Sequence, residues 1–196
     1  MTDSSIWNEE VAVPKTLISY VDPGVEATHE DYKNEADTYF FLCAFHDMTN
    51  EVPEVSDFPA LVAKLHKKGV SPSGKFGFPV STYQGRLQQD TTECDTWEES
   101  FSRGIRRFFE LGEDSQGYEQ EMAELREAIM EKVIPRLLHP LETEGRSIFP
   151  CLMHGDLWDG NTSVDAAMGS PVIFDACSSY AHHECKSQVK DVIFPS

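Results

Sequence analysis

The sequence predicts an α+β fold in which helices predominate, because its apolar pattern changes period once along the chain. Apolar residues recur at helical spacing in the ranges 58–68, 97–112 and 122–134. The pattern then changes to two short apolar segments, 148–153 and 171–174, with a polar loop between them. Since these strand-like segments follow the helices rather than alternate with them, we expect a mainly helical α+β unit.

The first elements are predicted to be a buried strand and a helix. Thr38–Phe45 is a continuous apolar and aromatic run of strand length. After a polar loop, Asp57 suits a helix cap and Pro59 suits the first helical turn. The helix is expected to end at Lys67, Lys68 and Gly69. Residues 70–93, which contain several glycines, are predicted to form a loop.

Two longer helices with apolar stripes are expected next. One starts near Trp97 and is predicted to end at Gly112; its stripe contains Trp97, Phe101, Ile105, Phe108 and Phe109. In the other, Pro135 is predicted to end or kink the helix; its stripe contains Met122, Leu125, Ile129, Val133 and Ile134. We interpret both stripes as core packing, with a pocket lining as the alternative for Trp97.

Composition and charge restrict the classes of function. The chain has 196 residues, of which 40% are hydrophobic and 26% are charged, as expected for a folded protein. Lys and Arg number 16 against 34 Asp and Glu, which gives a formal net charge of −18 and argues against nucleic-acid or membrane-surface binding. Neither a bilayer-length apolar stretch nor a secretory signal is present, and five scattered cysteines indicate reduced thiols. These features predict a cytoplasmic protein.

The residues with the clearest chemical pattern lie in the loop His154–Asn161 and at Asp175. Phosphoryl transfer from ATP needs a carboxylate that positions the acceptor hydroxyl and oxygen ligands for Mg²⁺. Asp156 and Asn161 are five residues apart on one loop, and Asp175 follows the next apolar segment. This spacing is a variant of the H-x-D-x-x-x-x-N arrangement of protein kinases. The alternative is that the glycines here only mark turns between short strands.

The loop resembles the catalytic loop of the fructosamine and ketosamine kinase family, within the aminoglycoside-phosphotransferase-like kinases, in the segment His154-Gly155-Asp156-Leu157-Trp158-x-Gly160-Asn161. The pair Leu157-Trp158 narrows the resemblance from that wider superfamily to this family. Three other segments also match the family pattern: Lys75-Phe76-Gly77-Phe78, the Trp97 segment with Phe101, and Phe174-Asp175 followed by Tyr180-Ala181-His182-His183-Glu184. The resemblance covers about residues 38–184.

The resemblance implies a protein-kinase-like fold, represented mostly by its helical large lobe. It implies an ATP- and Mg²⁺-dependent kinase that phosphorylates the 3-hydroxyl of ketosamines, such as ribulosamine or fructosamine, on glycated proteins. The phosphorylated sugar then falls off, so the activity is deglycating. By this resemblance the site residues are Asp156 as catalytic base, His154 as a brace of the catalytic loop, Asn161 and Asp175 as Mg²⁺ ligands, the backbone of Cys43, Ala44 and Phe45 as the adenine contact, and Trp158 and Trp97 as the lining of the sugar site.

The sequence also departs from the family pattern. Kinases of this type need a small lobe with a phosphate-covering loop and a strand Lys. Only 37 residues precede Thr38, and neither Lys15 nor Lys33 lies in a suitable strand. We therefore expect a small lobe that is largely missing, from a truncated or mis-spliced product or from a gene model with lost exons. Residues 1–37 are then a lead-in or small-lobe remnant, 38–184 the large lobe with its linker, and 185–196 an irregular tail.

Two other functions fit the sequence. A large-lobe fragment without catalytic activity is favoured by the missing small lobe and opposed by the complete set of Asp156, Asn161 and Asp175. A related kinase of choline, homoserine or an aminoglycoside is opposed by Leu157-Trp158.

The segment Gly69–Lys75 has the spacing of a phosphate-binding P-loop, but Phe76 stands where Ser or Thr is required, and a predicted helix precedes it. We interpret that match as coincidental.

Overall fold

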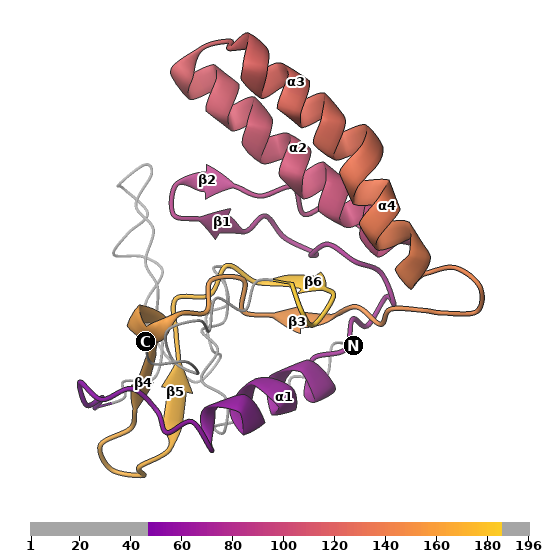
Figure 1. The fold of residues 1–196 in the computed structure, drawn as a ribbon. Helices are drawn as coiled ribbons and strands as arrows, with labels where there is room; N and C mark the ends of the chain where they lie inside the picture. Colours follow the sequence, from indigo (N-terminus) through magenta and orange to yellow (C-terminus); the bar gives the residue numbers. More distant parts are fainter. Residues whose placement is uncertain (1–46, 186–196) are drawn as a thin grey trace, which may run out of the picture.

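The computed structural model describes residues 47–185 and shows a helical arm beside short antiparallel strands (Figure 1). The strand Thr38–Phe45, the lead-in 1–37 and all but the first residue of the tail 185–196 lie outside the described residues. Along the chain the longer helices are α1 Phe58–Lys68, α2 Trp97–Gln116, α3 Gln120–Ala128 and α4 Ile134–Leu138. A π-helical segment, η2 Ile129–Val133, joins α3 to α4, and short 3₁₀ turns are η3 His139–Leu141 and η4 Asp159–Asn161.

The strands pair within three two-stranded antiparallel sheets in the described part of the chain. β1 Tyr83–Gln84 pairs with β2 Leu87–Gln88, β3 Cys151–Met153 with β6 Ser179–Ala181, and β4 Thr162–Val164 with β5 Pro171–Ile173. The predicted segments 148–153 and 171–174 thus contain β3 and β5, while β4 and β6 had no counterpart in the prediction. Within residues 47–185, no helix is long and apolar enough to cross a membrane.

The first helix begins and ends where predicted, although Asp57, at its N-cap position, makes no side-chain capping hydrogen bond. Pro59 lies in the first turn of α1, and the last turn contains Lys67 and Lys68 before Gly69. The buried face consists of Phe58, Leu61 and Leu65, at the spacing expected for one side of a helix. These side chains form one core cluster with Leu152 of β3, Leu157 and Ile173 of β5.

Strand β3 lies between that cluster and a second one. Leu152 contacts the α1 side, whereas Cys151 and Met153 belong to a cluster with Phe76, Trp97 and Ala181. Successive side chains of a strand point to opposite faces, so both faces of β3 are buried. This explains why the sequence of β3 is continuously apolar rather than alternating.

The helix α2 is longer than predicted, because it continues past Gly112 to Gln116. A glycine inside a helix costs only about 1 kcal/mol, which does not end a helix held by other contacts. Its start at Trp97 agrees with the prediction, and there the Thr96 side chain accepts a hydrogen bond from the Glu99 N–H at 3.2 Å. The Glu142 carboxylate accepts a second one from the Trp97 N–H at 2.8 Å.

Pro135 does not end the helix in which it lies. It occupies the first turn of α4, where its missing N–H is tolerated, and the π-helical segment η2 precedes it.

The apolar stripes of the arm are less buried than a core would require: of the residues predicted in them, only Trp97 and Ile134 are buried. The half-buried residues Phe101, Ile105 and Phe109 of α2 face Ile129, Val133, Ile134, Leu137 and Leu138 across an apolar groove of about 420 Å³.

The prediction of a loop over residues 70–93 is wrong in part, because β1 and β2 form a hairpin there. Gly85 and Arg86 make its two-residue turn, with Gly85 at a φ of 58°. A glycine adopts this left-handed conformation readily, as such tight hairpin turns require. Each strand has only two residues, too few for an alternating pattern in the sequence.

Replacement of Leu152 by Ala tests the role of β3. Leu152 is 1% exposed. The variant leaves a cavity, so we expect the free energy of unfolding to fall by about 2–5 kcal/mol. Leu87→Ala is the matched control, since Leu87 is 44% exposed and its loss should cost less than about 0.5 kcal/mol. Urea denaturation of the two variants measures both values, and equal losses would contradict the description of β3.

Candidate functional site

The pairing of β4 with β5 brings the two predicted site segments together. Thr162 at the start of β4 lies opposite Ile173 at the end of β5. The residues just outside this pair therefore become neighbours, and the Phe174 N–H donates to the Asn161 carbonyl at 3.1 Å. Asn161 and Asp175, 14 positions apart in the sequence, are thus held at the same end of one sheet.

His154 is buried between the loop and the end of β5. Its Nε2 lies 2.8 Å from the Phe174 carbonyl oxygen. Because that oxygen can only accept, Nε2 carries the proton. Nδ1 is then free to accept the Asp156 N–H, at a longer 3.4 Å. His154 therefore connects the start of the loop to the residue before Asp175.

Burial keeps the imidazole of His154 neutral. It lowers the pKa of His154 below its ordinary value, although the Phe174 carbonyl and the carboxylates of Asp156 and Asp175 act in the opposite direction. A neutral ring has one donor and one acceptor, which match the two hydrogen bonds described above. The geometry accordingly suits a brace rather than a proton carrier.

Asn161 holds Asp156 through one amide group. Its Nδ2 donates to the Asp156 backbone carbonyl at 2.7 Å and to the Asp156 Oδ2 at 3.2 Å. Asn161 is 5% exposed, whereas Asp156 is half-buried at the surface of the loop. Asp156 Oδ1 receives no hydrogen bond from the residues that the structure describes, and it is left for a proton or a hydroxyl group.

Asp175 is exposed and adopts a left-handed backbone conformation with a φ of 57°. Such a conformation costs a residue other than glycine about 1–2 kcal/mol, although Asp tolerates it better than most. Within residues 47–185 its carboxylate forms neither a hydrogen bond nor an ion pair. Surrounding contacts must therefore offset the cost of a backbone conformation that presents a free carboxylate.

The oxygens of Asn161 and Asp175 fit a hard divalent cation. Both side-chain hydrogen bonds that Asn161 makes to Asp156 use Nδ2, so its Oδ1 is not occupied by the described residues. Mg²⁺ is commonly held by one or two protein oxygens together with phosphate oxygens and water. Residues 47–185 contain no group of three or more His, Cys, Asp or Glu side chains arranged for a metal ion. Asn161 and Asp175 would supply two oxygen ligands of the kind that Mg²⁺ prefers.

Gly155 allows the loop to approach the chain after Asp175. Its φ is 83°, and a Cβ at this position would overlap the Cys177 carbonyl oxygen and lie 2.7 Å from the Cys177 Sγ. Only glycine fits both the conformation and the available space. The loop and the Asp175 segment are therefore in direct backbone contact.

The two tryptophans predicted to line the sugar site lie in different surroundings. Trp158 is 48% exposed in the loop, and its indole lies against Gly160, where a Cβ would collide with the ring. Trp97 is 6% exposed and packs against Phe76 and Phe101, with ring centroids 5.7 and 5.4 Å apart. The structure thus places Trp158 at the surface of the loop, against Gly160, and Trp97 in a core cluster. The predicted adenine contacts Cys43, Ala44 and Phe45 lie outside the described residues.

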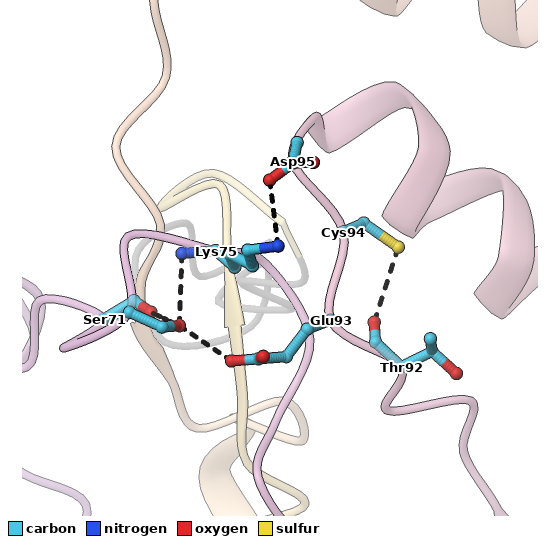
Figure 2. A network of polar contacts seen from close by, with 7 residues as sticks. Ser71, Lys75, Thr92, Glu93, Cys94 and Asp95 are labelled. Carbon is cyan, nitrogen blue, oxygen red and sulfur yellow. Dashed lines mark hydrogen bonds and ion pairs between the residues drawn. The ribbon is translucent and has the colours of Figure 1, made fainter.

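Two carboxylates, those of Glu93 and Asp95, lie beside the segment with P-loop spacing (Figure 2). It follows the helix α1, and the Lys75 Nζ pairs with the Asp95 carboxylate at 3.2 Å. The Ser73 hydroxyl donates to the Glu93 carboxylate at 2.7 Å. Two carboxylates at this position repel a phosphate, in agreement with the interpretation that the match is coincidental.

One residue at the edge of the site had no signal in the sequence. The Gln89 side chain, from the segment after β2, donates to the Cys177 carbonyl at 3.1 Å. Gln89 belongs to no recognised motif, and its partner lies 88 positions further along the chain. Only the folded structure reveals this contact.

Comparisons with known proteins identify relatives of this chain. The family model described as fructosamine kinase matches residues 10–193. A mouse ketosamine-3-kinase is 39% identical over 111 residues, which cover 56% of this chain and 33% of that protein. A chloroplastic protein-ribulosamine 3-kinase of indica rice is 35% identical over 126 residues, covering 64% of this chain and 34% of its own length. The chain thus spans about a third of these relatives.

Solved structures show the same similarity. A protein of Thermobifida fusca YX-ER1 assigned as a fructosamine-3-kinase matches with a TM-score of 0.56 and 25% identity, over 71% of this chain and 45% of that one. Another from Haemophilus somnus 129PT has the same TM-score at 16% identity, over 76% of this chain and 47% of its own, and supports the fold alone.

Replacement of Gly155 by Ala tests the backbone contact with Cys177. We expect a clearly larger loss of stability than the roughly 1–2 kcal/mol that the left-handed conformation alone costs, because the added methyl group overlaps the Cys177 carbonyl. Gly169→Ala is the control, since Gly169 has a φ of 66° and a Cβ added there would meet no atom within 4 Å. Denaturant titration measures both variants. Equal losses would mean that the close approach is not maintained in solution.

The neutral state of His154 predicts a pH dependence of stability. Since its pKa is lowered in the folded protein, the unfolded chain binds this proton first as the pH falls below about 6.5. Its contribution to stability is therefore present at neutral pH and lost from about pH 6.5 down to the lowered value. Denaturation between pH 5 and 7.5 should show a shallower slope for His154→Gln than for wild type. His66 and His182 shift in the same direction, so some slope remains. Identical slopes would contradict the assignment.

Proposed function

The chain belongs to the fructosamine kinase family, and from that premise we propose that it transfers a phosphoryl group from ATP to the 3-hydroxyl of a ketosamine. The acceptor is a ribulosamine or fructosamine, either attached to a protein amine or as a small molecule. The observation that carries the proposal is the joining of Asp156 to Asn161 by one amide, beside Asp175 at the end of the same sheet.

In the proposed reaction Asp156 receives the proton of the acceptor hydroxyl. The hydroxyl oxygen forms a bond to the γ-phosphorus of ATP, the bond from that phosphorus to the bridging oxygen breaks, and ADP leaves. The free Oδ1 of Asp156 is the proton acceptor, while the bond from Asn161 to Oδ2 fixes the direction of the carboxylate. Orientation of this kind accounts for much of the catalysis in phosphoryl transfer.

Asn161 and Asp175 are the proposed holders of Mg²⁺. When bound, Mg²⁺ neutralises charge on the phosphates. Asn161 contributes Oδ1, since its Nδ2 is used by Asp156, and Asp175 contributes its free carboxylate. One amide therefore connects the base to the cation site, so the two functions share a fixed geometry.

His154 is proposed as a positioning residue. Both ring nitrogens are engaged by backbone groups, Nε2 with Phe174 and Nδ1 with Asp156. It therefore acts on Asp156 and Asp175 through the backbone and does not transfer the proton itself. Trp158 is proposed to contact the sugar, because its indole is exposed and lies against Gly160 in the same loop as Asp156. The roles of Cys43, Ala44 and Phe45 at adenine and of Trp97 at the sugar remain predictions from the family resemblance.

Replacement of Asp156 by Asn tests the proposed reaction on this chain. Incubation with Mg-ATP and a lysine peptide carrying ribulosamine should add one phosphate, detected by mass spectrometry. Loss of the base should lower the rate by about 10²–10⁴-fold. Choline and an aminoglycoside, supplied in parallel, should gain no phosphate.

The matched control is Asp159→Asn in the same loop. Asp159 is exposed, and an Asn side chain can still accept the Gly160 N–H that its Oδ1 accepts at 2.9 Å. We expect this variant to change the rate by less than about twofold. A folded wild-type chain that phosphorylates no ketosamine would refute the proposal, and activity on choline or the aminoglycoside alone would assign a different acceptor.

A further inference from the structure

The position of Asp175 depends on its neighbours in the chain. Its side chain has no hydrogen bond or ion pair within residues 47–185, and its backbone is in the left-handed region. On the side before Asp175, Phe174 is held twice: its N–H donates to the Asn161 carbonyl at 3.1 Å, and its carbonyl accepts from His154 at 2.8 Å. One flank is thus fixed by the loop that carries Asp156.

The other flank is fixed by a residue from a different part of the chain. The Gln89 Nε2 donates to the Cys177 carbonyl oxygen at 3.1 Å and to the Thr82 Oγ1 at 3.0 Å. Because a carbonyl oxygen can only accept, the amide nitrogen of Gln89 must face Cys177. The contact is partly buried, so water competes for it less than at an open surface.

The Cys177 carbonyl also touches the catalytic loop. Gly155 packs so closely on it that a Cβ would overlap the oxygen. The same carbonyl therefore has Gln89 on one side and Gly155, which precedes Asp156, on the other. A displacement of Cys177 would move both Asp175, two residues earlier, and the loop that carries Asp156.

Gln89 is itself firmly placed. Its N–H donates to the Thr82 carbonyl at 3.0 Å, which closes the hairpin of β1 and β2. The next residue, Asp90, pairs with the Arg103 Nε of α2 at 3.2 Å. Figure 1 shows the hairpin between α2 and the pair β3–β6, in agreement with these contacts. The hairpin therefore connects the helical arm to the turn that carries Asp175.

We propose that Gln89 is a positioning residue of the phosphoryl-transfer site, which holds the Cys177 carbonyl and thereby sets the place of the Asp175 carboxylate relative to Asn161. The kinetic consequence rests on the proposed kinase function, whereas the structural consequence does not. Without the Gln89 bond, the Cys177 carbonyl keeps its packing against Gly155, and the pairing of β6 with β3 still holds the chain further on. The turn at Asp175, whose backbone conformation is strained, is then held less firmly. Gln89 does not contact the reacting groups and acts only through the backbone.

The test compares Gln89→Met with Thr82→Val in the full chain. Met has nearly the length and volume of Gln but cannot donate, so the first variant removes the bonds to both Cys177 and Thr82. Val has the shape of Thr without the hydroxyl, so the second removes only the bond between Gln89 and Thr82. Thr82 is 1% exposed, and its replacement controls for a general loss of packing in the hairpin.

The first measurement is amide hydrogen exchange, followed by mass spectrometry of a peptide covering residues 174–178. Gln89→Met should exchange on the order of tenfold faster than wild type in this peptide, while Thr82→Val remains close to wild type. Equal exchange in Gln89→Met and wild type would overturn the proposal. An equal increase in both variants would also overturn it, because that result indicates general loosening of the hairpin.

The second measurement is the steady-state phosphorylation of the ribulosamine peptide at several Mg²⁺ concentrations. For Gln89→Met we expect kcat to fall on the order of tenfold, with a higher half-saturating Mg²⁺ concentration and little change in the KM of the ketosamine. An unchanged kcat and Mg²⁺ dependence, with an active wild type, would overturn the kinetic role. A wild type that shows no phosphorylation would refute the proposed function instead, and hydrogen exchange would still decide whether Gln89 holds the turn.

Discussion

Strand β3 is the constraint on which the remainder of the structure depends. Leu152 on one face packs against α1, and Cys151 and Met153 on the other face pack in the cluster that includes Trp97 at the start of α2. The backbone of Leu152 also donates to the Gly69 carbonyl at 2.6 Å. Three residues thus connect the first helix, the helical arm and strand β6. Because His154 follows β3 directly, the candidate catalytic loop starts from the most enclosed part of the fold.

The site itself is built from backbone carbonyls more than from side-chain pairs. The carbonyls of Asp156, Phe174 and Cys177 accept from Asn161, His154 and Gln89, respectively. These donors are neutral, and within residues 47–185 neither the Asp156 nor the Asp175 carboxylate forms an ion pair. Ion pairs at the same places would neutralise the groups that the proposed reaction needs. Hydrogen bonds to backbone carbonyls therefore position the carboxylates without pairing them with a cation.

The parts of the molecule that the sequence predicted well are those with local causes. Pro59 and Gly69 mark the ends of α1 by their own backbone preferences, and the spacing of Asp156 and Asn161 on one loop permits the contact that the structure shows. The predicted end of α2 at Gly112 was wrong, because contacts elsewhere in the helix outweigh the small free-energy cost of a glycine inside it. The strained conformation of Asp175 and its contact chain through Cys177 depend on distant residues, so no local pattern signals them.

The indole of Trp158 provides the loop with an intrinsic optical probe. Its ring is half in water and lies against Gly160, one residue before Asn161, whereas Trp97 is enclosed among apolar side chains. Indole emission shifts to longer wavelength as its surroundings become more polar. The two fluorophores should therefore emit at different wavelengths, with the longer-wavelength component reporting on the candidate catalytic loop and the shorter-wavelength component on the core cluster that contains Trp97. Trp7 lies outside the described residues and would first be replaced. One emission spectrum would then report separately on the loop, through Trp158, and on the core cluster, through Trp97.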